Sequence, residues 1–130
     1  MVVVLIIGIL VAIALPTFLG ARERAQNRAG QSDLRNALAA AKVVYTDNSS
    51  YAAFDDAGVA VGIEPSLTWV LTDAAAVAGS VTINTASDTT VEMSTLSDSG
   101  DFFCIRDVET TGTVNGNVDA TGAVNCTGTW

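Results

Sequence analysis

The first 21 residues of the chain carry no charged side chain, and this apolar run restricts the fold more than any other feature. Residues 1–15 are almost wholly aliphatic, Pro16 and Gly20 follow, and the first charge is Arg22. A helix crosses the hydrocarbon of a bilayer with about 20 apolar residues, so the run is just long enough to span a membrane. The next segment has helical composition, so the sequence predicts one long helix with an apolar half and a polar half.

Two other interpretations of the apolar run fit less well. A cleaved secretory signal has a basic start and a small-residue cleavage site, whereas this chain has no basic start and its Ala12-x-Ala14 pattern is followed by Leu15 and Pro16. A buried core helix of a soluble protein would need a body large enough to cover it on every side. The remaining chain is too small for that.

Charge is divided unevenly along the chain. In the first 42 residues five basic side chains against two acidic ones give a net charge of +3, and in the remainder Arg106 against twelve acidic side chains gives −11. The basic helix could pair with the acidic part of a neighbouring copy, or it could lie near anionic lipid while the acidic part keeps the protein soluble. Nucleic acid binding is excluded for the acidic part, because phosphates need clustered cations.

The polar half of the helix, residues 22–50, has an apolar stripe at helical spacing. Leu34, Leu38, Ala41 and Tyr45 follow one another at steps of four, three and four, so we expect this stripe to face the rest of the protein. Residues 47–50 supply the stop. Within the apolar half we expect a break between Gly8 and Pro16, because proline in a helix interior costs about 3 kcal/mol and glycine about 1 kcal/mol.

Residues 51–130, which we call the head, have the composition of a small sheet. Residues 80–84, 90–96 and 102–108 alternate or run as strands between turn residues, which predicts an antiparallel sheet packed on the helix and an α+β fold. Residues 67–71 are too short to assign, and residues 74–78 fit either a helical turn or a loop. Three parts follow: the apolar run (1–21), an amphipathic helix (22–50) and the head (51–130).

The two cysteines, Cys104 and Cys126, both belong to the head. The residues between them are rich in Gly, Thr and Asn, so they have little means of ordering themselves, and a disulfide would close the segment. Two free thiols and a metal pair are the alternatives, and the absence of His from the sequence disfavours the metal pair. A disulfide would place the head outside the cytoplasm, against the side that the arginines after the apolar run would favour.

Catalytic motifs are missing from the sequence. It has no His for acid–base chemistry, no glycine-rich loop followed by Lys and no nucleophile elbow, so we expect neither an enzyme nor a cofactor. The acidic turns at Asp55-Asp56 and at residues 98–101 do not have the spacing of an EF-hand, and solvated turns are the better interpretation.

The N-terminal region closely resembles the first helix of type IV pilins. The resemblance is carried by the aliphatic run, by Gly8 and Pro16, and by the transition to an Ala- and Arg-rich helix, and it extends over residues 1–45. The alanine, arginine and glutamine content of this helix, with Tyr45 and Tyr51, is similar to that of pilins from Gram-positive, actinobacteria-like lineages. It implies a subunit of an extracellular filament whose apolar helix halves bundle at the centre and whose heads form the surface. The filament core would comprise Val4, Leu5, Ile6, Ile7, Ile9, Leu10, Val11, Ile13 and Leu15.

The resemblance also implies that Cys104 and Cys126 form the disulfide enclosing the C-terminal region, and that the stretch from Gly8 to Pro16 is unwound. The partners would be further copies of the chain, the cytoplasmic membrane before assembly, and the assembly machinery. The leader, the processing site and an early glutamate of such pilins would all precede Met1. A pseudopilin of a secretion or DNA-uptake machine and a membrane-anchored adhesin are the alternative functions.

Overall fold

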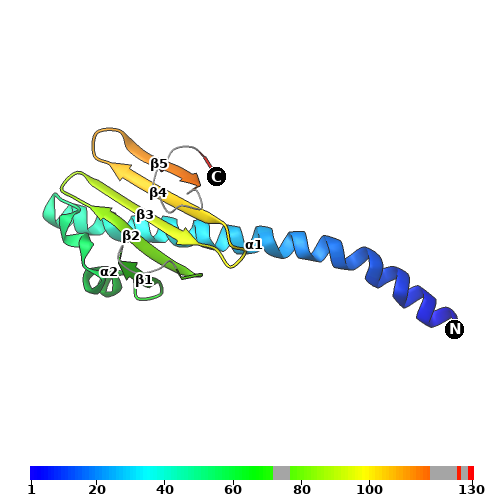
Figure 1. Cartoon of the computed structure of the whole chain (residues 1–130). Helices are drawn as coiled ribbons and strands as arrows, with labels where there is room; N and C mark the ends of the chain where they lie inside the picture. The colour runs from blue at the N-terminus through cyan, green and yellow to red at the C-terminus, as the bar shows by residue number, and fades with distance from the viewer. Residues whose placement is uncertain (72–76, 118–125, 127–128) are drawn as a thin grey trace.

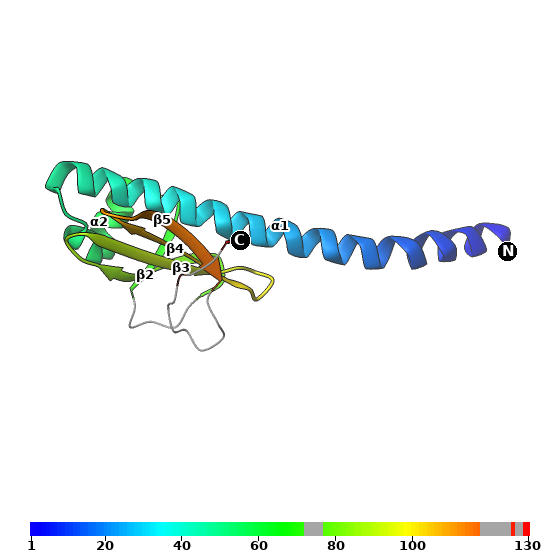
Figure 2. The ribbon, with the colours of Figure 1, turned by 90° about the horizontal axis from the view of Figure 1, so that it is seen from above.

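The computed structural model describes residues 1–71, 77–117, 126 and 129–130. The chain has an α+β fold in which one long helix, α1 (Val2–Asn48), lies along one face of a sheet and projects far beyond it. Figures 1 and 2 agree that the N-terminus lies at the free end of the projecting half. The shape is a rod with a small head at one end.

Helix α1 ends where the turn residues predict. Ser49 follows it in the left-handed conformation (φ 53°), and its backbone N–H donates to the carbonyl of Tyr45 at 2.7 Å. Two residues, Ser49 and Ser50, therefore separate α1 from the head.

The predicted break between Gly8 and Pro16 is not present, because α1 is continuous through both residues. Pro16 cannot donate to the preceding turn, yet the Thr17 hydroxyl donates to the carbonyl of Ala14 at 3.0 Å and to that of Ile13 at 3.3 Å. These bonds add local support beside the proline. The helix bows gently over its projecting half (Figure 1) instead of unwinding.

The sheet has five strands in sequence order: β1 (Thr68–Leu71), β2 (Ser80–Ala86), β3 (Thr90–Leu96), β4 (Phe102–Val108) and β5 (Gly112–Asn117). The β2–β3, β3–β4 and β4–β5 pairs are antiparallel, as expected, but β1 pairs parallel with β2. The antiparallel sheet expected from residues 80–84, 90–96 and 102–108 is therefore present, and β1, which the sequence left unassigned, adds a parallel strand at its edge. Most of residues 74–78, whose structure the sequence left open, lie outside the described residues.

The core lies between α1 and the inner face of the sheet. Leu34 and Ala41 of α1 are fully buried, and they pack with Ile83 of β2, Met93 of β3 and Ile105 of β4. Fully burying a large aliphatic side chain stabilises a fold by about 1.5 to 3 kcal/mol, so this layer is the main source of stability in the head. Figure 2 shows the sheet lying along only the C-terminal half of the helix.

Two short elements close one side of this core. The 3₁₀ helix η1 (Ala52–Asp55) and helix α2 (Ala57–Ile63) lie between α1 and β1. Phe54 is fully buried, and its ring meets that of Trp69 edge to face at 5.4 Å between centroids. Asp56 caps α2 by accepting the backbone N–H of Gly58 at 2.7 Å.

Candidate interaction surface

The projecting half of α1 is the largest uncovered apolar surface of the described chain. The aliphatic side chains from Val2 to Leu15 are each between 48% and 73% exposed, and this set includes every residue that we expect in a filament core. Phe18 and Leu19 extend the same surface. The helix is long and apolar enough to cross a membrane, and the stretch that qualifies is not buried against the head at all. We call residues 2–19 the apolar segment.

Gly30 is the first residue of α1 that is buried against the head. A Cβ added at Gly30 would lie 3.3 Å from Cγ2 of Thr95, so the absence of a side chain lets the helix approach β3 closely. Farther along, Leu34, Leu38 and Ala41 of the expected stripe are buried against the sheet. Tyr45, the last member, is only half-buried, and its ring lies 4.6 Å from that of Tyr51.

A polar clasp marks the same boundary. The side-chain amide of Asn27 in α1 accepts a hydrogen bond from the Ser97 hydroxyl at 2.8 Å and donates one to the Asp101 carboxylate at 2.6 Å. The Ser99 hydroxyl also donates to the Asn27 amide oxygen. These three partners form the turn between β3 and β4. The turn is therefore tied to the helix within residues 20–29, the mostly exposed part of α1 that precedes its first buried residue, and we call this part the neck.

A buried carboxylate connects α1, β4 and β5 at the other end of the head. Asp107 is only 5% exposed; it accepts the Tyr51 hydroxyl at 2.6 Å and the Thr113 hydroxyl, and it forms an ion pair with Lys42 at 3.3 Å. Burial raises the pKa of Asp107, but the hydrogen bonds from Thr113 and Tyr51 and the charge of Lys42 outweigh it, so the pKa lies below its ordinary value.

This network was not foreseen from the sequence. Its members come from positions 42, 51, 107 and 113, and no spacing between them signals a contact. Burial of Tyr51, and its hydrogen bond to Asp107, raise the pKa of the phenol. The network ties α1 to β4 and β5 of the head.

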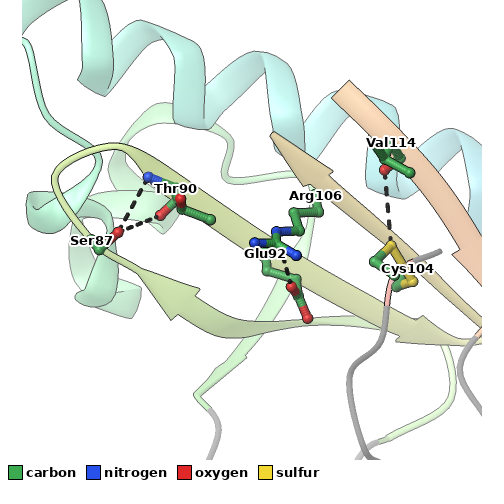
Figure 3. Close-up of polar contacts among 7 residues, drawn as sticks. Ser87, Thr90, Glu92, Cys104, Arg106 and Val114 are labelled. Carbon is green, nitrogen blue, oxygen red and sulfur yellow. Dashed lines mark hydrogen bonds and ion pairs between the residues drawn. A yellow bond between two sulfur atoms is a disulfide. The ribbon is translucent and has the colours of Figure 1, made fainter. Parts of the chain in front are cut away.

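The cysteines form a disulfide between Cys104 of β4 and Cys126, with 5.7 Å between their Cα atoms. Cys104 lies on the sheet face opposite α1, and the sulfur of Cys126 is in contact with the Val114 carbonyl at 3.9 Å (Figure 3). The described part of the segment between them, residues 105–117, is better ordered than predicted, because β5 lies within it and pairs along β4. On the same face Arg106 contacts Glu92 at 3.7 Å.

Trp130 packs against β4 and contacts both Cys104 and Phe103. Its indole N–H donates to the Cys104 carbonyl at 3.0 Å, and its ring meets that of Phe103 edge to face at 6.4 Å. The guanidinium of Arg35 lies 4.9 Å from the centre of the Trp130 ring, which is cation–π geometry. Residues far apart in the sequence thus fix the helix flank to the head.

No catalytic constellation is found in the described part of the chain. Within that part no group of three or more His, Cys, Asp or Glu side chains is arranged to hold a metal ion. The acidic turn at residues 98–101 uses Asp101 in the clasp, and Asp56 is used as a helix cap. The feature with the largest energetic consequence is therefore the uncovered apolar segment.

Comparison with known proteins identifies no relative. No protein-family model, no curated protein and no solved structure matches this chain. Functional inference therefore rests on the exposed surface and on the chemistry of its residues.

Proposed function

We propose that the chain is the structural subunit of an extracellular type IV pilus, held in the cytoplasmic membrane before it assembles through its apolar segment. One observation carries the proposal: residues 2–19 extend as a continuous, uncovered apolar helix from a head that is fully packed without them. Such a segment needs either lipid or other apolar helices around it.

The energetic argument follows from the exposed side chains. Eleven large aliphatic residues lie between Val2 and Leu15, and leaving such side chains in water costs about 1.5 to 3 kcal/mol each. The total is on the order of 20 kcal/mol, which exceeds the stability of most small domains. A free soluble copy is therefore strongly disfavoured, and a bundle of these helices would keep the segment dry outside the membrane.

The neck supports assembly over simple anchoring. Ala21, Ala25 and Ala29 are all exposed and lie at helical spacing on the side of α1 away from the head. Small side chains let helix backbones approach closely. A tether needs no such contact beyond the membrane surface, whereas a filament needs adjacent helices to pack along their length.

The helix break that the resemblance implies becomes part of this proposal. The single chain has a continuous helix, so any unwinding between Gly8 and Pro16 would have to occur on assembly, where neighbouring helices can satisfy the freed backbone groups. Pro16 lowers the cost of that change, because one hydrogen bond of the helix is already missing there.

The direct test is to shear surface material from the source cells, image it by electron microscopy, and identify the fibre protein by mass spectrometry. The proposal expects this chain to be the main component of a thin fibre. Cells whose fibres lack the chain would overturn it, and its presence only in short, minor assemblies would favour a pseudopilin.

A substitution separates assembly from anchoring. Ile9→Lys places a charge in the middle of the apolar segment, and Val43→Lys adds the same charge at an exposed position of α1 beside the head. We expect Ile9→Lys to abolish fibres and Val43→Lys to preserve them. If the parent forms no fibres and Ile9→Lys only releases the protein from the membrane, the apolar segment is a tether.

A further inference from the structure

Four basic residues form a single stripe along one flank of α1. Arg24, Arg28, Arg35 and Lys42 are separated by four, seven and seven positions, so at 3.6 residues per turn they lie within about 40° of one another around the helix. Arg22 lies on roughly the opposite flank, where it lines a depression with Asp98 and Ser99. We call the four residues the cationic stripe.

The head of the same chain binds the upper half of the cationic stripe. Arg35 stacks on the Trp130 ring at 4.9 Å, and Lys42 forms the ion pair with Asp107 at 3.3 Å. The lower half continues past the edge of the head. Arg24 and Arg28 are exposed, and among the residues that the structure describes neither has an ion-pair partner.

Arg24 and Arg28 also repel each other. They stand four positions apart on one face, and like charges at this spacing destabilise a helix by a few tenths of a kcal/mol. Solubility alone does not require two cations on the same face of α1. Binding of anionic groups along this flank would remove the repulsion.

Complementary anions gather at the end of the molecule farthest from the N-terminus, on α1 and on the head. Asp47, Asp88 and Glu109 are exposed there, and the backbone N–H of Glu109 donates to the Thr89 carbonyl at 2.9 Å, which brings the β2–β3 and β4–β5 turns together. Figure 1 shows both turns beside the C-terminal end of α1. We call these three residues the distal acidic end.

Little positive charge is close enough to neutralise the distal acidic end within one copy. Lys42 is the nearest basic residue along α1, and it is paired with Asp107. Arg106, the only basic residue after position 42 in the sequence, contacts Glu92 on the outer face of the sheet. An unmatched anionic end and an unmatched cationic neck thus lie on the same molecule.

From this layout we infer that Arg24 and Arg28 of one copy bind the distal acidic end of another copy in the filament. Along α1, the midpoint between Arg24 and Arg28 lies about 30 Å from Asp47, at 1.5 Å per residue. In a filament of parallel copies, a displacement of about 30 Å along the axis therefore places the two arginines of one copy beside the distal acidic end of another. The inference rests on the proposed function, since it requires a parallel assembly.

The displacement is compatible with burial of the apolar segments. Residues 2–19 span about 27 Å, so two copies displaced by about 30 Å leave their apolar segments end to end. Copies at intermediate positions along the filament axis then pack around these apolar segments. The charge contact would set the axial position of each copy, while contacts between apolar segments would supply most of the affinity.

The first experiment compares two variants with the same net charge. Arg24→Gln combined with Arg28→Gln removes two charges from the lower stripe, and Val61→Glu combined with Thr68→Glu changes the net charge equally at two exposed positions outside α1. We expect the arginine variant to lower the yield of sheared fibres at least tenfold and the control variant to stay within twofold of the parent. Unchanged urea midpoints for detergent-solubilised subunits would verify folding. Equal yields from both variants would overturn the inference.

Restoring the opposite pair tests which acidic group is the partner. In an Arg28→Glu background, Asp47→Lys should recover the fibres, whereas Asp98→Lys, which restores the same net charge beside the neck, should not. Recovery by Asp98→Lys alone would overturn the assignment to the distal acidic end. If the parent itself contains no fibres of this chain, the proposed function fails, and this outcome is distinct from failure of the charge contact.

Anionic lipid is the other possible partner of Arg24 and Arg28, and fractionation distinguishes it. The inference expects Arg24→Gln with Arg28→Gln to keep unassembled subunits in the membrane fraction at the parent level. Loss of membrane retention together with fibre loss would assign the arginines to lipid headgroups instead.

Discussion

Replacing Tyr51 by Phe tests whether the buried Asp107 network stabilises the head. The substitution removes one hydroxyl, which donates to Asp107 at 2.6 Å, and keeps the ring that contacts Tyr45. A hydrogen bond to a charged group contributes about 1.5 to 3 kcal/mol, and its loss leaves a carboxylate that is 5% exposed with fewer partners. The free energy of unfolding of the head should fall by about that amount.

Urea denaturation of the full chain in detergent measures the change. Both tryptophans, Trp69 and Trp130, belong to the head, so their fluorescence reports its unfolding while detergent covers the apolar segment. With a slope of about 1 to 1.5 kcal/mol per molar urea for a small unit, the midpoint should drop by about 1 to 3 M.

Tyr45→Phe is the matched control. Its hydroxyl lies near Glu109, which is exposed and raises the pKa of the phenol, so water can take the place of this contact. We expect its midpoint to equal that of the parent. Equal losses for Tyr51→Phe and Tyr45→Phe would refute the argument that burial makes the Asp107 contacts strong.

The pH dependence gives a second readout. The pKa of folded Asp107 lies below its ordinary value of 3.8, so its stabilisation is complete above that value and is lost as the pH falls through the folded pKa. Tyr51→Phe weakens one cause of the lowered pKa. The difference in stability between parent and variant should therefore shrink below about pH 4, and a constant difference down to low pH would contradict the role of the charged carboxylate.

Three further changes have defined outcomes. Replacing Cys104 and Cys126 by Ser should lower the free energy of unfolding by about 3 kcal/mol, given their separation of 22 residues, and a reduced parent should unfold at the same urea concentration as the variant. Gly30→Val should cost the head about 1 to 3 kcal/mol in urea, because β3 leaves no room for the side chain, whereas Gly8→Val, with nothing within 4 Å, should not alter the midpoint. Pro16→Ala should stabilise α1 by about 3 kcal/mol, so its far-ultraviolet helical signal should persist to higher temperature; an unchanged melting profile would contradict this.

Local periodicity in the sequence was sufficient to predict the helix and strands that bury one face. The spacing of Leu34, Leu38 and Ala41 identified the side of α1 that meets the sheet, and β3 and β4 were recognised from alternation and turn residues. These patterns work because burial on one face imposes a period on the sequence. Both faces of β3 are nevertheless mostly buried, which alternation alone did not predict.

Other features depend on contacts that no local pattern records. The direction of β1 is set by its register with β2, and four residues are too few to signal it. Strand β5 has few large apolar residues and is ordered by its hydrogen-bonded ladder with β4. The helix through Pro16 shows that a local cost of about 3 kcal/mol need not break a long helix, because the remaining turns on both sides stay bonded.

The concentration of basic residues on α1 also determines how the protein reacts with reagents. Lys42 is the only lysine in the sequence, and its amine is held by the carboxylate of Asp107. An amine-reactive dye will therefore modify one side chain, and faster labelling will report opening of the head. Trypsin can cut between Val43 and Val108 only at Arg106, which leaves one long peptide from the middle of the chain. A protease that cleaves at acidic residues would divide that peptide and extend the coverage of the head in sheared fibres.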